Sequence, residues 1–213
     1  MILNEDKALK VAEFLLQIKA VKLNPNAPFT WASGIKSPIY CDNRVTLSYP
    51  NIRTFIRQAY ASAVLDYFGK PDVIAGVATG GIAQGALVAQ ELGIPFIYVR
   101  SEAKGHGMGN MIEGHFEPGQ KVVVIEDLIS TGGSSLKAVD ALRAADVDVR
   151  GLVATFTYGF EEAHERFMKA ECPYVTLTDY EILLANALST NLINDDELAS
   201  LKEWKVNPKE WKK

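Results

Sequence analysis

The sequence predicts an α/β protein with a doubly wound, mainly parallel sheet of about five strands and a small amino-terminal hood. Two apolar, β-branched runs, 73–77 and 121–125, are each followed by a glycine-rich turn and a helical pattern. Such runs are typical of parallel strands covered on both faces. The segment at 29–44, FTWASGIKSPIYCDNR, breaks this alternation and predicts two short strands outside the core. The length of 213 residues suits one domain.

The amino-terminal part is predicted to contain two helices with the hood strands between them. Apolar residues at helical spacing predict a helix over 4–20, with Asn4 or Asp6 as its cap. The two hood strands follow, joined by a turn. A second helix is predicted from Pro50, capped by Ser48 and ended by Gly69.

The rest of the chain repeats strand, loop and helix. The predicted strands are 72–77, 96–99, 121–125, 151–157 and 174–177, and the helices are 81–92, 134–145 and 160–170. Two tail helices follow at 180–188 and 195–204, and Trp204 and Trp211 are expected to pack the tail on the body. These elements predict a hood formed mainly by 1–48, a core over 49–180 and a helical tail over 180–213.

Composition excludes several classes of protein. The 22 basic and 26 acidic residues give a net charge of −4, which argues against a strongly basic nucleic-acid-binding surface. Two cysteines are too few for a disulfide framework, so a reducing, cytoplasmic setting is expected. The uncharged stretch 73–90 is interrupted by Thr79 and several glycines. A strand, loop and helix explain it better than a membrane span.

The segment VVVIEDLISTGGSS carries the strongest chemical signal. Glu126 and Asp127 are predicted to end a buried strand, and a hydroxyl- and glycine-rich turn then opens a helix. Backbone amides of 130–134 can converge there on an anion, with the Thr131 and Ser134 hydroxyls as further donors. The acids suit the hydroxyls of a sugar, or a cation, beside that anion. The segment therefore predicts a sugar-phosphate site, although an exposed turn with capping hydroxyls is the alternative.

Two further loops add to this prediction. In 100–109, glycines flanking Lys104 and His106 indicate a loop that delivers cations, with an ordinary strand connection as the alternative. In 77–82, the glycines after Thr79 permit close backbone approach to a second anion. Two anion sites flanking a sugar, with cations above, fit a pyrophosphorylated sugar phosphate whose pyrophosphate leaves.

The three motifs also carry a family resemblance. VVVIEDLISTGGSS resembles the phosphoribosyl-pyrophosphate (PRPP) motif of type I phosphoribosyltransferases. The hood stretch SGIKSPIY and the loop RSEAKGHG are similar to those of orotate phosphoribosyltransferases. The resemblance implies transfer of ribose 5-phosphate from PRPP to N1 of orotate, giving orotidine 5′-monophosphate and pyrophosphate in UMP biosynthesis. It also implies Mg²⁺ held mainly by PRPP, with no direct protein ligand, and a homodimer whose flap is shared between subunits, without nucleic-acid or membrane partners.

The resemblance assigns roles to individual residues. The implied catalytic residues are Arg100, Lys104, His106 and Asp127. PRPP would bind these four and also Glu126, Leu128, Ile129, Ser130, Thr131, Gly132, Gly133, Ser134, Thr79 and Gly80. The glycine-rich turn would take the 5′-phosphate, the two acids the ribose hydroxyls, and the flap cations the pyrophosphate. Orotate would contact Ser130, Lys36 and Tyr40.

Several positions depart from the family pattern. Ser101, Ala32 and Gly80 stand where many members have lysine, and 157–159 reads TYG where some have an arginine. The group that neutralises the orotate carboxylate is thereby left open, with Lys36 and hood amides as candidates. Two other functions are weighed: transfer to another base, which the hood segment disfavours, and a regulatory PRPP sensor that binds nucleic acid, which the acidic balance disfavours.

Overall fold

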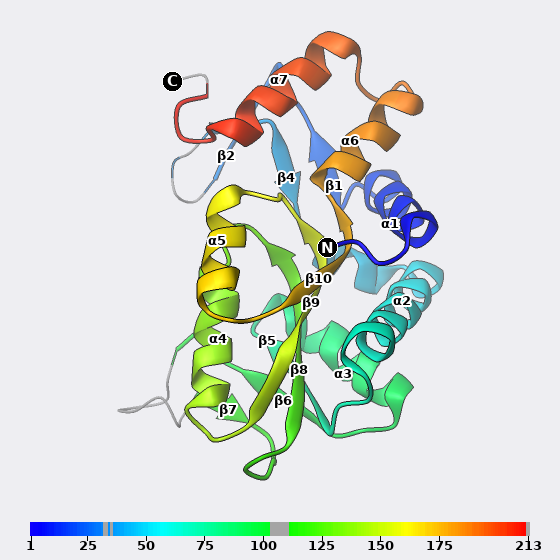
Figure 1. The fold of residues 1–213 in the computed structure, drawn as a ribbon. Coiled ribbons are helices and arrows are strands. Elements are labelled where there is room, and N and C mark those ends of the chain that lie inside the picture. Colours follow the sequence, from blue (N-terminus) through cyan, green and yellow to red (C-terminus); the bar gives the residue numbers. More distant parts are fainter. Residues whose placement is uncertain (32–33, 35, 103–110, 212–213) are drawn as a thin grey trace.

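The protein is built around one six-stranded sheet with helices on both faces (Figure 1). The computed structural model describes residues 1–31, 34, 36–102 and 111–211. The sheet order is β10-β9-β8-β5-β6-β7, and all neighbours are parallel except β6 and β7. The strands are β5 (Val73–Val77), β6 (Phe96–Val99), β7 (Ile112–Glu113), β8 (Lys121–Ile129), β9 (Asp148–Thr157) and β10 (Tyr174–Asp179).

The strand order reverses between β5 and β8. From β5 the chain moves outward to β6, and from β8 it moves in the opposite direction to β9 and β10. Helices that leave the two central strands therefore lie on opposite faces, α3 (Gly80–Leu92) on one and α4 (Gly133–Arg143) on the other. Such a reversal leaves a crevice at the carboxyl ends of the two strands, where open α/β sheets bind ligands.

Residues of a central strand alternate between the two faces. In β8, Val123 and Ile125 belong to the core formed with α1 (Glu5–Gln17), α2 (Pro50–Phe68), α3 and the tail. Val122 and Val124 belong to the opposite core, formed with α4 and α5 (Glu161–Lys169). All four side chains are fully buried. This explains the continuous apolar run in the sequence, because each face of the strand meets a helical layer.

Local signals set most of the helix ends. Asn4 caps α1 by accepting from the Lys7 amide at 2.8 Å, and Gly69 ends α2 with φ +72°. Ser48 was predicted to cap α2, but it lies in the short 3₁₀ helix η1 (Asn43–Ser48). Tyr49 holds the cap position without a side-chain bond, and Pro50 follows at the first helical position, where its fixed φ suits a helix start.

The hood consists of two small antiparallel pairs. Strand β1 (Val21–Leu23) pairs with β4 (Ile39–Cys41), and β2 (Phe29–Thr30) pairs with β3 (Lys36–Ser37). Two short strands were predicted within 29–44, where the structure has β2, β3 and β4, and β1 was not predicted. Trp31 joins the hood to the body, with ring centroids 5.7 Å from those of Tyr158 and Trp204. Helix α1, grouped with the hood in the prediction, instead packs on β10 and α6 (Tyr180–Ser189).

The length of β8 and the edge strand β7 differ from the prediction, whereas the packing of the tail agrees with it. The strand predicted to end at Ile125 continues to Ile129, because its next residues pair with β9, and the antiparallel edge strand β7 was not predicted. The tail prediction is confirmed: Trp204 and Trp211, within and after α7 (Asp195–Val206), are 0% and 5% exposed. Within the described part of the chain, every helix is too short or too polar to cross a membrane.

Candidate active site

A cavity of about 300 Å³ lies where the strand order reverses. The β5–α3 turn (residues 78–79) and the β8–α4 turn (residues 130–132) form two of its walls, with the end of β8 between them. The structure thus brings together two of the three loops predicted from the sequence. The lining residues are Ala78, Thr79, Gly80, Glu126, Asp127, Leu128, Ser130, Thr131, Gly132, Gly133 and Ser134.

The β8–α4 turn has the geometry of an anion site. Gly132 holds the cap position of α4 with φ +78°, a left-handed conformation that suits glycine. The cap has no side-chain hydrogen bond, so the first amides of α4 keep their capacity to donate. An anion beside them would also be stabilised by the positive end of the helix dipole, roughly half a unit charge.

Glu126 is held beneath this turn. Its side chain is 4% exposed, and its carboxylate accepts from the Ser135 hydroxyl and the Asp127 amide, each at 3.0 Å. Burial raises the pKa of Glu126 well above its ordinary value, and the neighbouring Asp127 carboxylate raises that pKa further. A buried, hydrogen-bonded carboxyl beside a second one can exchange hydrogen bonds with sugar hydroxyls, and positive charge on the sugar would favour the ionised form of the pair.

Asp127 is only partly buried and lies against the start of α3. A Cβ added to Gly80 would overlap the Asp127 carboxylate. A lysine at position 80, as in many members of the family that the sequence resembles, would therefore require Asp127 to lie elsewhere. From the hood side, the Asn43 amide donates to the Asp127 carbonyl at 2.6 Å. Asn43 thus holds the Asp127 backbone from the hood, and the absence of a side chain at Gly80 leaves room for the Asp127 carboxylate at the start of α3.

Tyr60 supports the same stretch of β8 from below. Its hydroxyl donates to the Glu126 carbonyl at 2.5 Å and shares a 2.6 Å hydrogen bond with the Thr155 hydroxyl. Sequence reasoning missed Tyr60, Asn43 and Ser135. Ser135 had a local signal, since it lies in the VVVIEDLISTGGSS segment, whereas Asn43 and Tyr60 reach the site across 84 and 66 residues of sequence.

The third predicted loop is described only at its base. Arg100 follows β6, does not line the cavity and pairs with Glu113 at 3.4 Å. Ser101 is held by Lys137 of α4, whose ammonium donates to the Ser101 carbonyl at 2.6 Å. Lys104 and His106 lie outside the described residues, as does Ala32 of the hood.

The remaining predicted residues lie apart from the cavity wall. Lys36 donates to the Thr30 hydroxyl at 3.1 Å, and Tyr40 is 41% exposed beside the Phe29 ring. Both belong to the hood strands. Ile129, predicted with the phosphate-binding residues, is fully buried in β8 and does not line the cavity, whereas Leu128 does.

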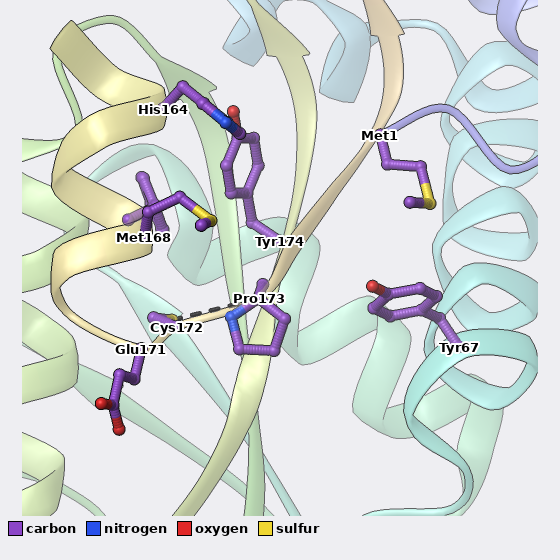
Figure 2. A pocket seen from close by; sticks show the side chains of 9 residues that line it. Met1, Tyr67, His164, Met168, Glu171, Cys172, Pro173 and Tyr174 are labelled. Atoms are coloured by element: carbon purple, nitrogen blue, oxygen red, sulfur yellow. Dashed lines mark hydrogen bonds between the residues drawn. The ribbon is translucent and has the colours of Figure 1, made fainter.

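A larger cavity of about 430 Å³ lies beside the start of β10, between α5 and α2 (Figure 2). Met1, Tyr67, Met168 and Tyr174 give it a largely apolar wall, and none of the predicted site residues lines it. One side chain links the two cavities: Phe167 lines this one, and its ring lies under Gly132 of the β8–α4 turn. The chemistry predicted from the sequence belongs to the smaller, more polar cavity.

Comparison with known proteins gives one family. Residues 46–184 match the phosphoribosyl transferase domain family. The chain is 59% identical over 200 residues to orotate phosphoribosyltransferase of Phocaeicola vulgatus, covering 94% of each chain. Among solved structures, UMP synthase of Leishmania donovani matches with TM-score 0.79 and 29% identity over 93% of this chain and 42% of that one. Orotate phosphoribosyltransferase of Aeropyrum pernix matches with TM-score 0.75 and 27% identity over 86% and 99%.

Proposed function

This chain belongs to the orotate phosphoribosyltransferases, and we propose that the cavity between β5 and β8 is the site of its reaction. The enzyme transfers ribose 5-phosphate from PRPP to N1 of orotate, giving orotidine 5′-monophosphate and pyrophosphate in pyrimidine biosynthesis. One observation carries the proposal: two strand-to-helix turns, each followed by a helix that begins with glycine, enclose a cavity with two carboxyl groups between them. That spacing suits a sugar with a phosphate group at each end.

The residues divide the reaction as follows. The β8–α4 turn binds the 5′-phosphate, Glu126 and Asp127 accept from the ribose hydroxyls, and the β5–α3 turn faces the pyrophosphate. As the bond from C1 to the pyrophosphate oxygen breaks, its electron pair leaves with pyrophosphate and positive charge develops on the sugar. The two carboxyl groups stabilise that charge. N1 of orotate then bonds to C1, and its proton is released to the departing pyrophosphate.

The flap cations act on the leaving group. Arg100, Lys104 and His106 neutralise pyrophosphate and exclude water, as the family resemblance implies. Lys36, Tyr40 and Ser130 contact orotate from the hood and the turn.

Mg²⁺ is proposed as the cofactor. The described residues contain no group of three metal-ligating side chains, and the cavity offers the adjacent carboxyl groups of Glu126 and Asp127. This donor set fits an ion that keeps its waters and substrate phosphates as main ligands. When bound, Mg²⁺ neutralises charge on the pyrophosphate.

We also propose a cytoplasmic homodimer that shares its flap between subunits. Both cysteines, Cys41 and Cys172, are free thiols, as suits a reducing setting. Complementation tests the sharing: Lys104→Ala and Asp127→Asn subunits are each expected to be inactive alone. Mixed dimers regain activity if the flap acts on the partner, because one site then contains neither change. A flap that acts within its own subunit gives no recovery.

The direct test follows orotate by its ultraviolet absorbance in the presence of PRPP and Mg²⁺. Uracil, hypoxanthine and adenine are run in parallel. Asp127→Asn is expected to lower turnover, and Asp148→Asn is the matched control, because Asp148 pairs with Arg150 at the opposite end of β9. Full activity of Asp127→Asn would remove the reaction from this cavity.

A further inference from the structure

Helix α5 places a guanidinium group beside the β8–α4 turn. Nη1 of Arg166 lies 3.5 Å from the Thr131 carbonyl oxygen, and a Cβ added to Gly133 would lie 3.4 Å from the same nitrogen. The next residue, Phe167, is 1% exposed and lies under Gly132. Arg166 is therefore carried by a helix that is packed against the turn.

The β8–α4 turn lacks enough positive charge to balance a bound phosphate, and Arg166 can supply it. The described lining of the 300 Å³ cavity carries the carboxyl groups of Glu126 and Asp127 and no lysine, arginine or histidine. Backbone amides and a helix dipole supply only about half a positive charge, whereas a phosphate monoester carries close to two negative charges at neutral pH. Arg100 cannot serve here in its described position, because it pairs with Glu113 after β6.

We infer that Arg166 is a binding residue for the 5′-phosphate of the ribose, an inference that rests on the proposed function of the cavity. Without substrate, Nη2 of Arg166 pairs with Glu162 one helical turn earlier, at 2.5 Å. The two side chains are 46% and 47% exposed, so this pair is weak and readily exchanged. On binding, the guanidinium exchanges this carboxylate for phosphate oxygens, which its planar fork can contact in pairs.

The role of Glu162 makes the inference specific. If Arg166 only braced the Thr131 carbonyl, removing Glu162 would leave substrate binding unchanged or weaker. If Arg166 binds phosphate, Glu162 competes for it, and removing that carboxylate strengthens PRPP binding. The two roles therefore predict opposite results for one substitution.

The test uses the full-length enzyme with Arg166→Gln, Arg166→Lys and Glu162→Gln. Losing a charge-assisted hydrogen bond is expected to raise KM for PRPP about tenfold in Arg166→Gln, with kcat and KM for orotate nearly unchanged. Arg166→Lys is expected to recover part of the loss, and Glu162→Gln to lower KM for PRPP about twofold. Arg150→Gln is the matched control, since Arg150 is equally exposed and pairs with Asp148 away from the cavity.

Two inhibitors distinguish a specific loss of 5′-phosphate binding from a general disturbance of the site. The inhibition constant of ribose 5-phosphate is expected to rise with Arg166→Gln, whereas that of pyrophosphate stays constant. Equal changes for both inhibitors, an unchanged KM for PRPP, or the same change in Arg150→Gln would overturn the inference. If the wild-type enzyme did not consume orotate, the proposed function would fail, and direct titration with ribose 5-phosphate would still decide the role of Arg166.

Discussion

The β5–α3 and β8–α4 turns look alike in sequence and differ in the reason for their glycines. Each follows a buried strand and opens a helix at the same cavity. After the first turn, Gly81 lies at the start of α3 with helical backbone, but any Cβ there would overlap the Ile125 carbonyl of the neighbouring strand. In the second, Gly132 has φ +78°, a conformation that L side chains rarely adopt.

The difference teaches that one residue pattern can answer two physical demands. Close approach to another strand is a property of the packed sheet, whereas a left-handed φ is a property of the turn itself. Where glycine is required by close approach, any side chain should be strongly destabilising. Where it is required only by a positive φ, a substitution should cost a similar, moderate amount of stability whatever the side chain. The following substitutions test that distinction.

The largest effect is expected for Gly81→Ala. Its Cβ would meet backbone, so α3 must move away from β8, and the free energy of unfolding should fall by at least ~3 kcal/mol. Chemical denaturation measures this. Gly93→Ala is the control, since Gly93 has φ +64° and open space around it, and should cost ~1 kcal/mol. Equal costs for the two variants would contradict the close-approach explanation.

Gly132→Ala is expected to cost ~2 kcal/mol, because it combines an unfavourable φ with a contact 2.7 Å from Phe167 Cε2. Adding Phe167→Leu removes the contact and leaves the backbone term. In a double-mutant cycle, the pair should be less destabilised than the sum by ~1 kcal/mol. Strict additivity would show that the aromatic contact contributes nothing.

Gly80→Ala should affect activity more than stability. Its Cβ would overlap a side chain, the Asp127 carboxylate, which can turn away. In the proposed site the displaced carboxylate would no longer face the ribose, so kcat/KM for PRPP should fall about tenfold, or ~1.4 kcal/mol in transition-state terms. Steady-state kinetics beside a denaturation curve separate the two effects. Retained activity with lost stability would reverse this interpretation.

The smallest effect concerns pH and the strand end between the two turns, because residues 78–79 and 130–132 carry no titratable side chain and Glu126 lies in β8. The pKa of Glu126 is raised in the folded state. The stability its protonated form contributes is therefore complete below the ordinary value of 4.5 and lost as pH rises through the folded pKa. Glu126→Gln does not titrate, so its stability relative to wild type should improve by ~1 kcal/mol between pH 4.5 and 8. Denaturation at both pH values measures this, and a constant difference would contradict it.

The sequence predicted most elements because their causes are local or periodic. Apolar runs placed β5, β6 and β9, Asn4 placed the start of α1, and Gly69 placed the end of α2. Predictions were wrong where a neighbouring strand decides whether a segment forms a strand and how long that strand is. Strand β8 runs past its acids to Ile129 because β9 continues beside it, and β7 is a strand only through β6. Neither partner is visible from the segment alone.

For the site, the two turns and the acids between them were predicted from residues that are consecutive in the chain. Their supports were not: Asn43 fixes Asp127 from the hood, and Tyr60 fixes Glu126 from α2. A hydrogen bond across more than sixty residues leaves no periodic signal in either segment.

The sequence by itself determined the family, the parallel sheet and which residues stand at the strand ends, because each depends on short-range patterns of polarity and conformation. The tertiary structure decided which turns share a cavity, why Gly81 admits no side chain, and that Arg166 lies at the β8–α4 turn. These are distances between segments, which are set only once strands pair and helices pack on them.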